Sequence, residues 1–292
     1  MAQVSVPREL RFSVNGVDFA AQEWGDPTQL PVLALHGWLD NSASFFALAP
    51  RLRDVHVVAL DLAGHGKSDH RPGRAAYTLW DDINDIFAVA DHLGWKRFVL
   101  LGHSRGAIIG TLAAGTFPDR FIALGLVEGL LPDPARAEDA PKQLAEAIKG
   151  LRAQQQKIPS VYPDIQVAIK ARERGMFPLG HEAAKALTER GVVAQEKGVS
   201  WSTDPRLLAP SMFKLSRDQL HAFVDQVSAP IKLLLGVDGL PKLYPNYLQE
   251  VDRFANVDYE VLSGGHHLHM EQEVDVVAEK LNAFFFPFYG LT

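Results

Sequence analysis

The segment Gly102-His103-Ser104-Arg105-Gly106 could form a nucleophilic centre, because it places one serine between two glycines. An apolar run at residues 98–101 predicts a strand before it, and small residues at 107–117 predict a helix after it. A serine on such a sharp turn exposes its hydroxyl, and larger residues at the two glycine positions would collide. The N-terminus of the following helix favours negative charge beside the serine. We therefore predict that Ser104 is a nucleophile; the alternative is a chance glycine-rich turn.

Two backbone N–H groups near this serine could stabilise an oxyanion. His36-Gly37-Trp38 ends another apolar run, at residues 32–35. An N–H just beyond that strand, together with the N–H of Arg105, would supply the two donors that acyl transfer uses. The alternative is a plain turn at the end of a strand.

Three histidines near the C-terminus are candidates for a general base. His266, His267 and His269 follow a pair of glycines and a predicted strand at residues 257–262. A histidine on the loop after the last strand, late in chain order behind Ser104, suits a base, and we favour His266. We expect His267 and His269 to pack or to orient other groups. A metal cluster is the alternative, but the chain has no cysteine and no H-E-x-x-H motif, so we expect no metal ligands.

The imidazole of such a base needs an acid to hold its tautomer. Asp238 lies just past the buried apolar run at residues 231–235, and Glu128 directly follows another at 122–127. Either carboxylate would reach the edge of the sheet where such sites gather, and either could instead cap a turn. We favour Asp238 and keep Glu128 as the alternative acid.

The elements around these residues alternate between strands and helices. Short, nearly continuous apolar runs separated by helical periodicity predict an α/β fold with a mostly parallel, buried sheet. Asn15-Gly16 between two β-rich runs predicts a hairpin near the N-terminus. The alternation then stops for about 100 residues, far more than a crossover needs. We therefore predict a core formed by residues 1–128 and 215–292, with a mostly helical cap inserted at 129–214.

Composition excludes several classes of protein. The 292 residues are 47% hydrophobic with a net charge of −6, which is typical of a globular protein rather than a nucleic-acid binder. The absence of cysteine excludes disulfides, thiolate metal sites and a cysteine nucleophile. No apolar run approaches the roughly 20 residues of a membrane span, and no signal peptide is visible. We expect a cytoplasmic monomer or homodimer with no stable membrane insertion and no nucleic-acid partner.

Four motifs together resemble the α/β-hydrolase fold superfamily. They are His36-Gly37-Trp38, the segment from Asp61 to Asp69, Gly102 to Gly106, and Gly265-His266 with His269-Met270-Glu271. They occur in the expected order, and the segment at residues 198–207 also resembles the cap end of serine hydrolase-like proteins. The resemblance implies a Ser104, His266 and Asp238 triad, an oxyanion hole formed by the amides of Trp38 and Arg105, and a lid at 129–214.

The spacing around Asp238, the favoured acid, departs from the family's pattern. Only Val237 lies between Gly236 and Asp238, where the family commonly has two residues, and Glu128 stands where some relatives place the acid. The Gly-Lys-Ser at residues 66–68 is not a phosphate-binding loop, because Asp61 occupies a position that must be glycine.

These features predict a cofactor-free serine hydrolase that cleaves a small carboxylic ester through an acyl-enzyme. We expect His103 and the cap residues Phe177, Trp201 and Met212 to contact the substrate, with an apolar acyl group. Thioesterase, lactonase, amidase and C–C hydrolase activity are alternatives on the same fold. A non-catalytic binding protein is an alternative of another class.

Overall fold

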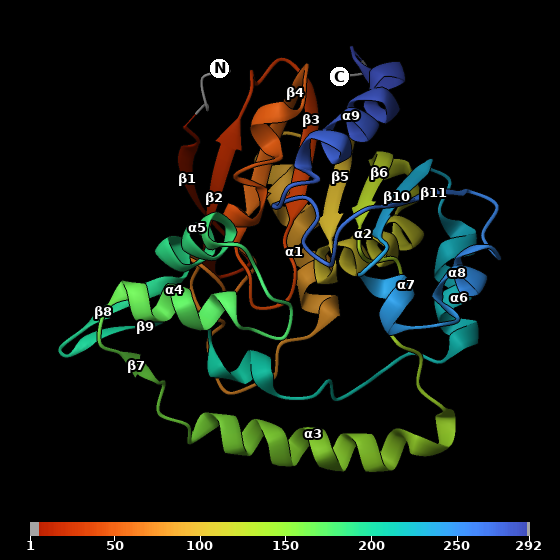
Figure 1. Cartoon of the computed structure of the whole chain (residues 1–292). Coiled ribbons are helices and arrows are strands. Elements are labelled where there is room, and N and C mark those ends of the chain that lie inside the picture. The colour runs from red at the N-terminus through yellow and green to blue at the C-terminus, as the bar shows by residue number, and fades with distance from the viewer. Residues whose placement is uncertain (1–5, 291–292) are drawn as a thin grey trace.

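A computed structural model describes residues 6–290, which are organised around a central eight-stranded sheet (Figure 1). The strands lie in the order β1-β2-β4-β3-β5-β6-β10-β11. The pairings of β2 with β1 and with β4 are antiparallel, and the other neighbours in this sheet are parallel. The α/β prediction is therefore confirmed. The strands are β1 (Arg8–Val14), β2 (Val17–Trp24), β3 (Leu30–Leu35), β4 (Val55–Leu60), β5 (Phe98–His103), β6 (Phe121–Val127), β10 (Ile231–Gly236) and β11 (Val257–Leu262).

The central strands are buried on both faces. Along β3, Leu33 and Leu35 belong to one hydrophobic cluster, whereas Val32 and Ala34 belong to another on the opposite face. This separation follows from the period of two in a strand, and it explains why these strands are apolar throughout. Helices cover both clusters. The first is covered by α1 (Leu79–His92), α2 (Arg105–Thr116) and α6 (Arg217–Gln226), and the second by α9 (Val274–Phe285).

The predicted N-terminal hairpin is present. Asn15 and Gly16 both have positive φ angles, 51° and 74°, and Val14 pairs with Val17 across the turn. Two positive φ angles are what a tight hairpin turn of the I′ type requires, and asparagine and glycine adopt them most readily.

The segment 129–214, here called the cap segment, leaves the sheet after β6 and returns before α6. It contains α3 (Ala140–Gln155), α4 (Ile165–Glu173) and α5 (His181–Gly191), and in Figure 1 α3 lies well away from the sheet. The helical expectation is incomplete, because β7 (Val161–Tyr162), β9 (Gly198–Trp201) and β8 (Val192–Gln195) form a small antiparallel sheet. These strands are only two to four residues long, too short for a periodic signal. Between β10 and β11 the chain forms two short helices, α7 (Leu240–Leu243) and α8 (Tyr247–Val251).

Buried polar contacts fasten the cap segment to the rest of the chain. The Arg190 guanidinium, 4% exposed, donates to both carboxylate oxygens of the fully buried Asp61 at 3.0 Å. The Tyr77 hydroxyl donates to Asp204 at 2.9 Å. At the ends of the segment, the N–H of Ala135 donates to the carbonyl of Leu215 at 2.8 Å. The chain therefore departs and returns at nearly one point. No helix within residues 6–290 is long and apolar enough to cross a membrane.

Burial opposes protonation of two further histidines, His36 and His65. His36 Nε2 accepts from the N–H of Leu62 at 3.0 Å, and its Nδ1 faces the carbonyl of Gly37 at 2.7 Å. His65 donates from Nδ1 to the carbonyl of Ala63, while its Nε2 is buried without a partner among the described residues. Burial lowers the pKa of both rings, and the neighbouring charges of His36 and Arg105 lower that of His65 further.

We expect acid to destabilise the protein through these two rings. Below a pH of about 6.5 the unfolded chain binds protons that the folded chain excludes, so the free energy of unfolding falls as pH falls. Each histidine contributes a slope of at most about 1.4 kcal/mol per pH unit. Urea unfolding of the wild type and His65→Gln across pH 7.5 to 5.5 measures this. The variant should have the shallower slope, and equal slopes would contradict the assignment.

Candidate active site

Ser104 occupies a strained turn between β5 and α2. Its φ and ψ are 49° and −113°, an unusual conformation for a residue with a side chain. Neighbouring backbone explains the flanking glycines. A Cβ on Gly102 would lie 2.6 Å from the backbone of Ala107, and one on Gly106 would lie 2.1 Å from the carbonyl oxygen of Leu35. The turn leaves Ser104 facing a cavity, as the G-x-S-x-G pattern predicts.

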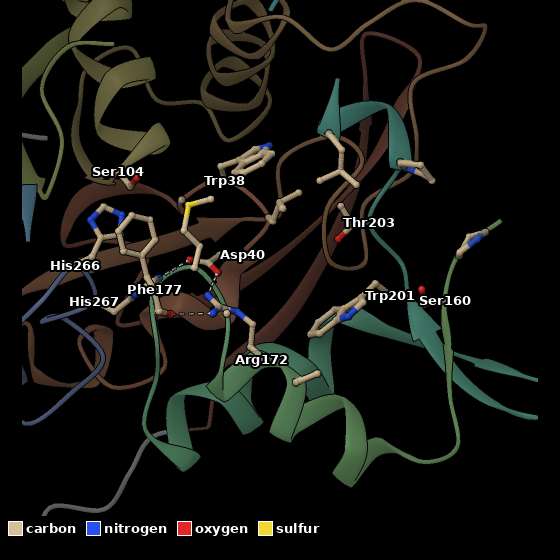
Figure 2. A pocket seen from close by; sticks show the side chains of 18 of the residues that line it. Trp38, Asp40, Ser104, Ser160, Arg172, Phe177, Trp201, Thr203, His266 and His267 are labelled. Carbon is tan, nitrogen blue, oxygen red and sulfur yellow. Dashed lines mark hydrogen bonds and ion pairs between the residues drawn. The ribbon is translucent and has the colours of Figure 1, made fainter. Parts of the chain in front are cut away.

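His266 lies on the loop after β11 and faces the same cavity (Figure 2). Its Nδ1 contacts Oε2 of Glu128 at 2.9 Å. The Glu128 carboxylate also accepts from the N–H groups of Gly236 at 2.7 Å and Leu240 at 2.8 Å. Because this carboxylate accepts from three sides, it fixes the proton of His266 on Nδ1, which leaves the Nε2 lone pair for another partner.

The structure corrects the expectation placed on Asp238. Its side chain is 59% exposed and bonds Nζ of Lys242 at 2.7 Å, so it does not hold His266. Glu128, the alternative acid, is placed there instead, because its positive φ of 51° turns it out of β6. Gly239 supplies the room, since a Cβ there would lie 2.2 Å from Oε2 of Glu128.

The expected oxyanion donors are the N–H groups of Arg105, which directly follows the serine, and of Trp38, which borders the same cavity. Arg105 is the first residue of α2, so its N–H has no acceptor within the helix. The guanidinium of Arg105 bonds Asp82 at 2.5 Å, which leaves its backbone as the group next to the site. Trp38 borders the cavity together with Ser104, and its indole N–H donates to the carbonyl of Leu207 in the cap segment at 3.0 Å. Within the described residues, no hydrogen bond joins the Ser104 hydroxyl to His266.

The cavity has a volume of about 400 Å³ and lies between the sheet edge and the cap segment. Three of the four predicted substrate contacts, His103, Phe177 and Trp201, line it, whereas Met212 does not. Met176 supplies a methionine side chain there instead. The ring of Phe177 stacks on His266, with centroids 4.0 Å apart and planes at 25°. The cap segment therefore touches the candidate base directly.

A polar cluster on the cavity wall, formed by Asp40, Arg172 and His267, is not predicted by the sequence. Asp40 accepts from Nη2 of Arg172 at 2.8 Å and from Nε2 of His267 at 3.2 Å, as the dashed lines of Figure 2 show. Burial opposes ionisation of Asp40, but the hydrogen bond and charge of His267 and the charge of Arg172 hold its pKa well below the usual value. His103 donates from Nε2 to the carbonyl of His266 at 2.9 Å, and burial lowers its pKa well below the usual range. The one sequence signal for Asp40 is its position two residues after His36-Gly37-Trp38.

Comparison with known proteins identifies the fold. Residues 31–157 match the model of a family described as alpha/beta hydrolase fold. This range includes Ser104, Glu128 and the turn that follows β3. The chain has the α/β-hydrolase fold.

Curated relatives of this α/β hydrolase are named serine hydrolase-like proteins. One from Dictyostelium discoideum is 29% identical over 88% of this chain and 76% of the relative. Another from Danio rerio is 28% identical over 96% and 88%.

Among solved structures, a hypothetical protein from Pseudomonas aeruginosa PAO1 is 42% identical, with a TM-score of 0.92, over 95% of this chain and 99% of that chain. A thioesterase domain from the curacin biosynthetic pathway is 27% identical, with a TM-score of 0.83, over 95% of this chain and all of that domain.

Proposed function

We propose that this α/β hydrolase cleaves small carboxylic esters, with Ser104 as nucleophile, His266 as general base and Glu128 as the acid that orients it. The observation that carries the proposal is the bond between His266 Nδ1 and Glu128, because it directs the basic nitrogen away from the acid while both His266 and Ser104 face one cavity. The acid is therefore proposed at the end of β6 rather than at Asp238.

The reaction follows the logic of a serine triad. Ser104 Oγ attacks the ester carbonyl carbon while His266 Nε2 takes the hydroxyl proton. The carbonyl oxygen becomes an oxyanion that the N–H groups of Trp38 and Arg105 stabilise. The C–O bond to the alcohol then breaks, His266 returns the proton to the leaving oxygen, and an acyl-enzyme remains. Water, deprotonated by His266, releases the acid and restores Ser104. No cofactor is needed.

The cap segment is proposed as the lid and the source of substrate preference. Apolar side chains dominate its contribution to the cavity, among them Met176, Phe177, Trp201 and Leu208. Such a surface suits an apolar acyl chain. The indole N–H of Trp38 donates to the carbonyl of Leu207, so this hydrogen bond connects the proposed lid to the turn that carries one of the proposed oxyanion donors.

Thioester hydrolysis is a second candidate, because the solved structures include a thioesterase domain 27% identical over nearly the whole of both chains. The mechanism needs no new residue, since a thiolate is a better leaving group than an alkoxide. Esters and thioesters of one acyl chain, compared by kcat/KM, separate the two activities.

A fluorophosphonate probe and a series of p-nitrophenyl esters from short to long acyl chains test the proposal together. We expect one probe per chain and an optimum at intermediate chain length, since a cavity of about 400 Å³ limits the acyl group. No labelling, with binding but no turnover of the esters, would favour a non-catalytic binding protein. Labelling that persists in Ser104→Ala would move the nucleophile elsewhere.

A further inference from the structure

We propose that Asp40, His103 and His267 form a binding site for one first-row transition-metal cation such as Zn²⁺ on the wall of the cavity. The ligand atoms are Oδ2 of Asp40, Nδ1 of His103 and Nε2 of His267. Metal binding at these residues does not depend on the proposed hydrolase activity. The sequence alone predicts no metal site, because β3, β5 and the loop after β11 bring these residues together from distant positions.

The three atoms have the spacing of a metal site. Asp40 Oδ2 lies 3.2 Å from His267 Nε2 and 3.9 Å from His103 Nδ1, and all three atoms lie within 4.8 Å of one another. Zinc bound to nitrogen and oxygen at about 2.0–2.2 Å in a tetrahedron separates its ligand atoms by roughly 3.4 Å. Closing the site therefore needs only small side-chain movements and transfer of the His267 proton from Nε2, which faces Asp40, to Nδ1, which has no hydrogen-bond partner among the described residues.

The chemistry of His103 points to a ligand. Its ring is 1% exposed, and Nε2 carries a proton because it donates to the carbonyl of His266. The second nitrogen, Nδ1, therefore presents a lone pair, and it has no hydrogen-bond partner among the described residues. A histidine whose far nitrogen is held by a carbonyl is the usual form of a metal-binding imidazole.

Gly37 leaves space beside these atoms. A Cβ at this position would lie 2.9 Å from His103 Nδ1 and 3.3 Å from Asp40 Oδ2. Gly37 is not among the glycines with positive φ, so its backbone does not demand glycine. The close approach of the two candidate ligands accounts for it instead.

The groups around the three ligands orient the Asp40 carboxylate and leave a fourth coordination position open. Arg172 holds the other oxygen of Asp40, at 2.8 Å, which orients the carboxylate but also places a competing positive charge nearby. Asp40, His103 and His267 all line the cavity, so a fourth coordination position faces it and can take water or a carboxylate. If the proposed hydrolysis is correct, the cation inhibits it, because a divalent charge near His266 opposes the positive charge the imidazole acquires in the reaction.

Equilibrium dialysis of the full chain against Zn²⁺, with the metal measured by atomic absorption, tests the site. We expect about one Zn²⁺ per chain, with affinity reduced at least about tenfold in His267→Gln and in Asp40→Asn. His181→Gln, which removes an exposed histidine paired with Glu173, is the matched control and should retain binding. Arg172→Ala should bind Zn²⁺ more tightly, because it removes the competing charge, whereas a purely structural ion-pair network predicts no gain.

X-ray absorption at the zinc edge of the wild type keeps the test independent of whether the variants fold. Two imidazole ligands and one carboxylate in a tetrahedral shell are expected. No stoichiometric binding, a shell of oxygen alone, or affinity lost in His181→Gln but kept in His267→Gln would overturn the proposal. Zinc inhibition of ester hydrolysis, relieved by a chelator, tests the consequence separately, so a failure of the proposed function leaves the binding result intact.

Discussion

Replacing Ser104 by alanine is expected to lower kcat/KM for a p-nitrophenyl ester by on the order of 10⁵-fold while leaving the thermal midpoint nearly unchanged. The variant loses the only atom proposed to attack the carbonyl. The turn itself should persist, because the close approaches at Gly102 and Gly106 shape it rather than the hydroxyl. Residual activity would come from the cavity and the two N–H donors.

Ser160→Ala is the matched control, because this second serine lines the same cavity from the cap segment. Its kcat/KM should stay within about threefold of the wild type, as usual for an exposed residue outside the chemistry. Steady-state kinetics on both variants, with circular dichroism to verify folding, decide the matter. Retention of more than a few per cent of activity by Ser104→Ala would remove it from the mechanism.

Glu128→Gln is expected to reduce kcat/KM by about 10³- to 10⁴-fold, the range typical of removing the acid from a serine triad. The amide keeps the shape but cannot stabilise the imidazolium, and its NH₂ faces groups that all donate: His266 Nδ1 and the N–H groups of Gly236 and Leu240. A loss of stability of about 1–3 kcal/mol should accompany this change.

Asp238→Asn supplies the comparison. It removes only an exposed pair with Lys242, and such pairs contribute about 0–1 kcal/mol, so its kcat/KM should change less than about threefold. Rates should be referred to the folded fraction of each variant, measured by thermal unfolding. A larger loss in Asp238→Asn than in Glu128→Gln would return the acid role to Asp238.

The fold could be predicted from the sequence because its signals are local. Continuous apolar runs identify the buried parallel strands, and the glycines around Ser104 specify a turn whose neighbours exclude side chains. The position of His266 was predictable as well, because the loop that follows the final strand begins at the same edge of the sheet as the turn of Ser104.

Which carboxylate contacts His266 was not predictable, because Asp238 and Glu128 follow adjacent strands and differ only in geometry. That geometry depends on the positive φ of Glu128 and on the space above Gly239, and neither has a signature that separates the two carboxylates in the sequence. Similarly, Met212 and Met176 are both apolar residues of the cap segment, and only the path of the chain brings Met176 to the cavity. The cluster of Asp40, Arg172 and His267 depends on three distant segments meeting.

The hydrogen bond between Ala135 and Leu215 makes the inserted segment separable in principle from the scaffold that carries the chemistry. The two ends of the cap segment are joined by this bond, so segments of different length can be exchanged there without moving β6 or α6. Such exchanges would change the residues that line the cavity while the sheet stays the same. The exchange has two conditions. Any replacement must bring a cation to the buried Asp61, as Arg190 does now, and another to the buried Asp40, as Arg172 does, since an unpaired buried carboxylate would cost several kcal/mol. Recombination of such segments is thus constrained less by the junction than by these two charges.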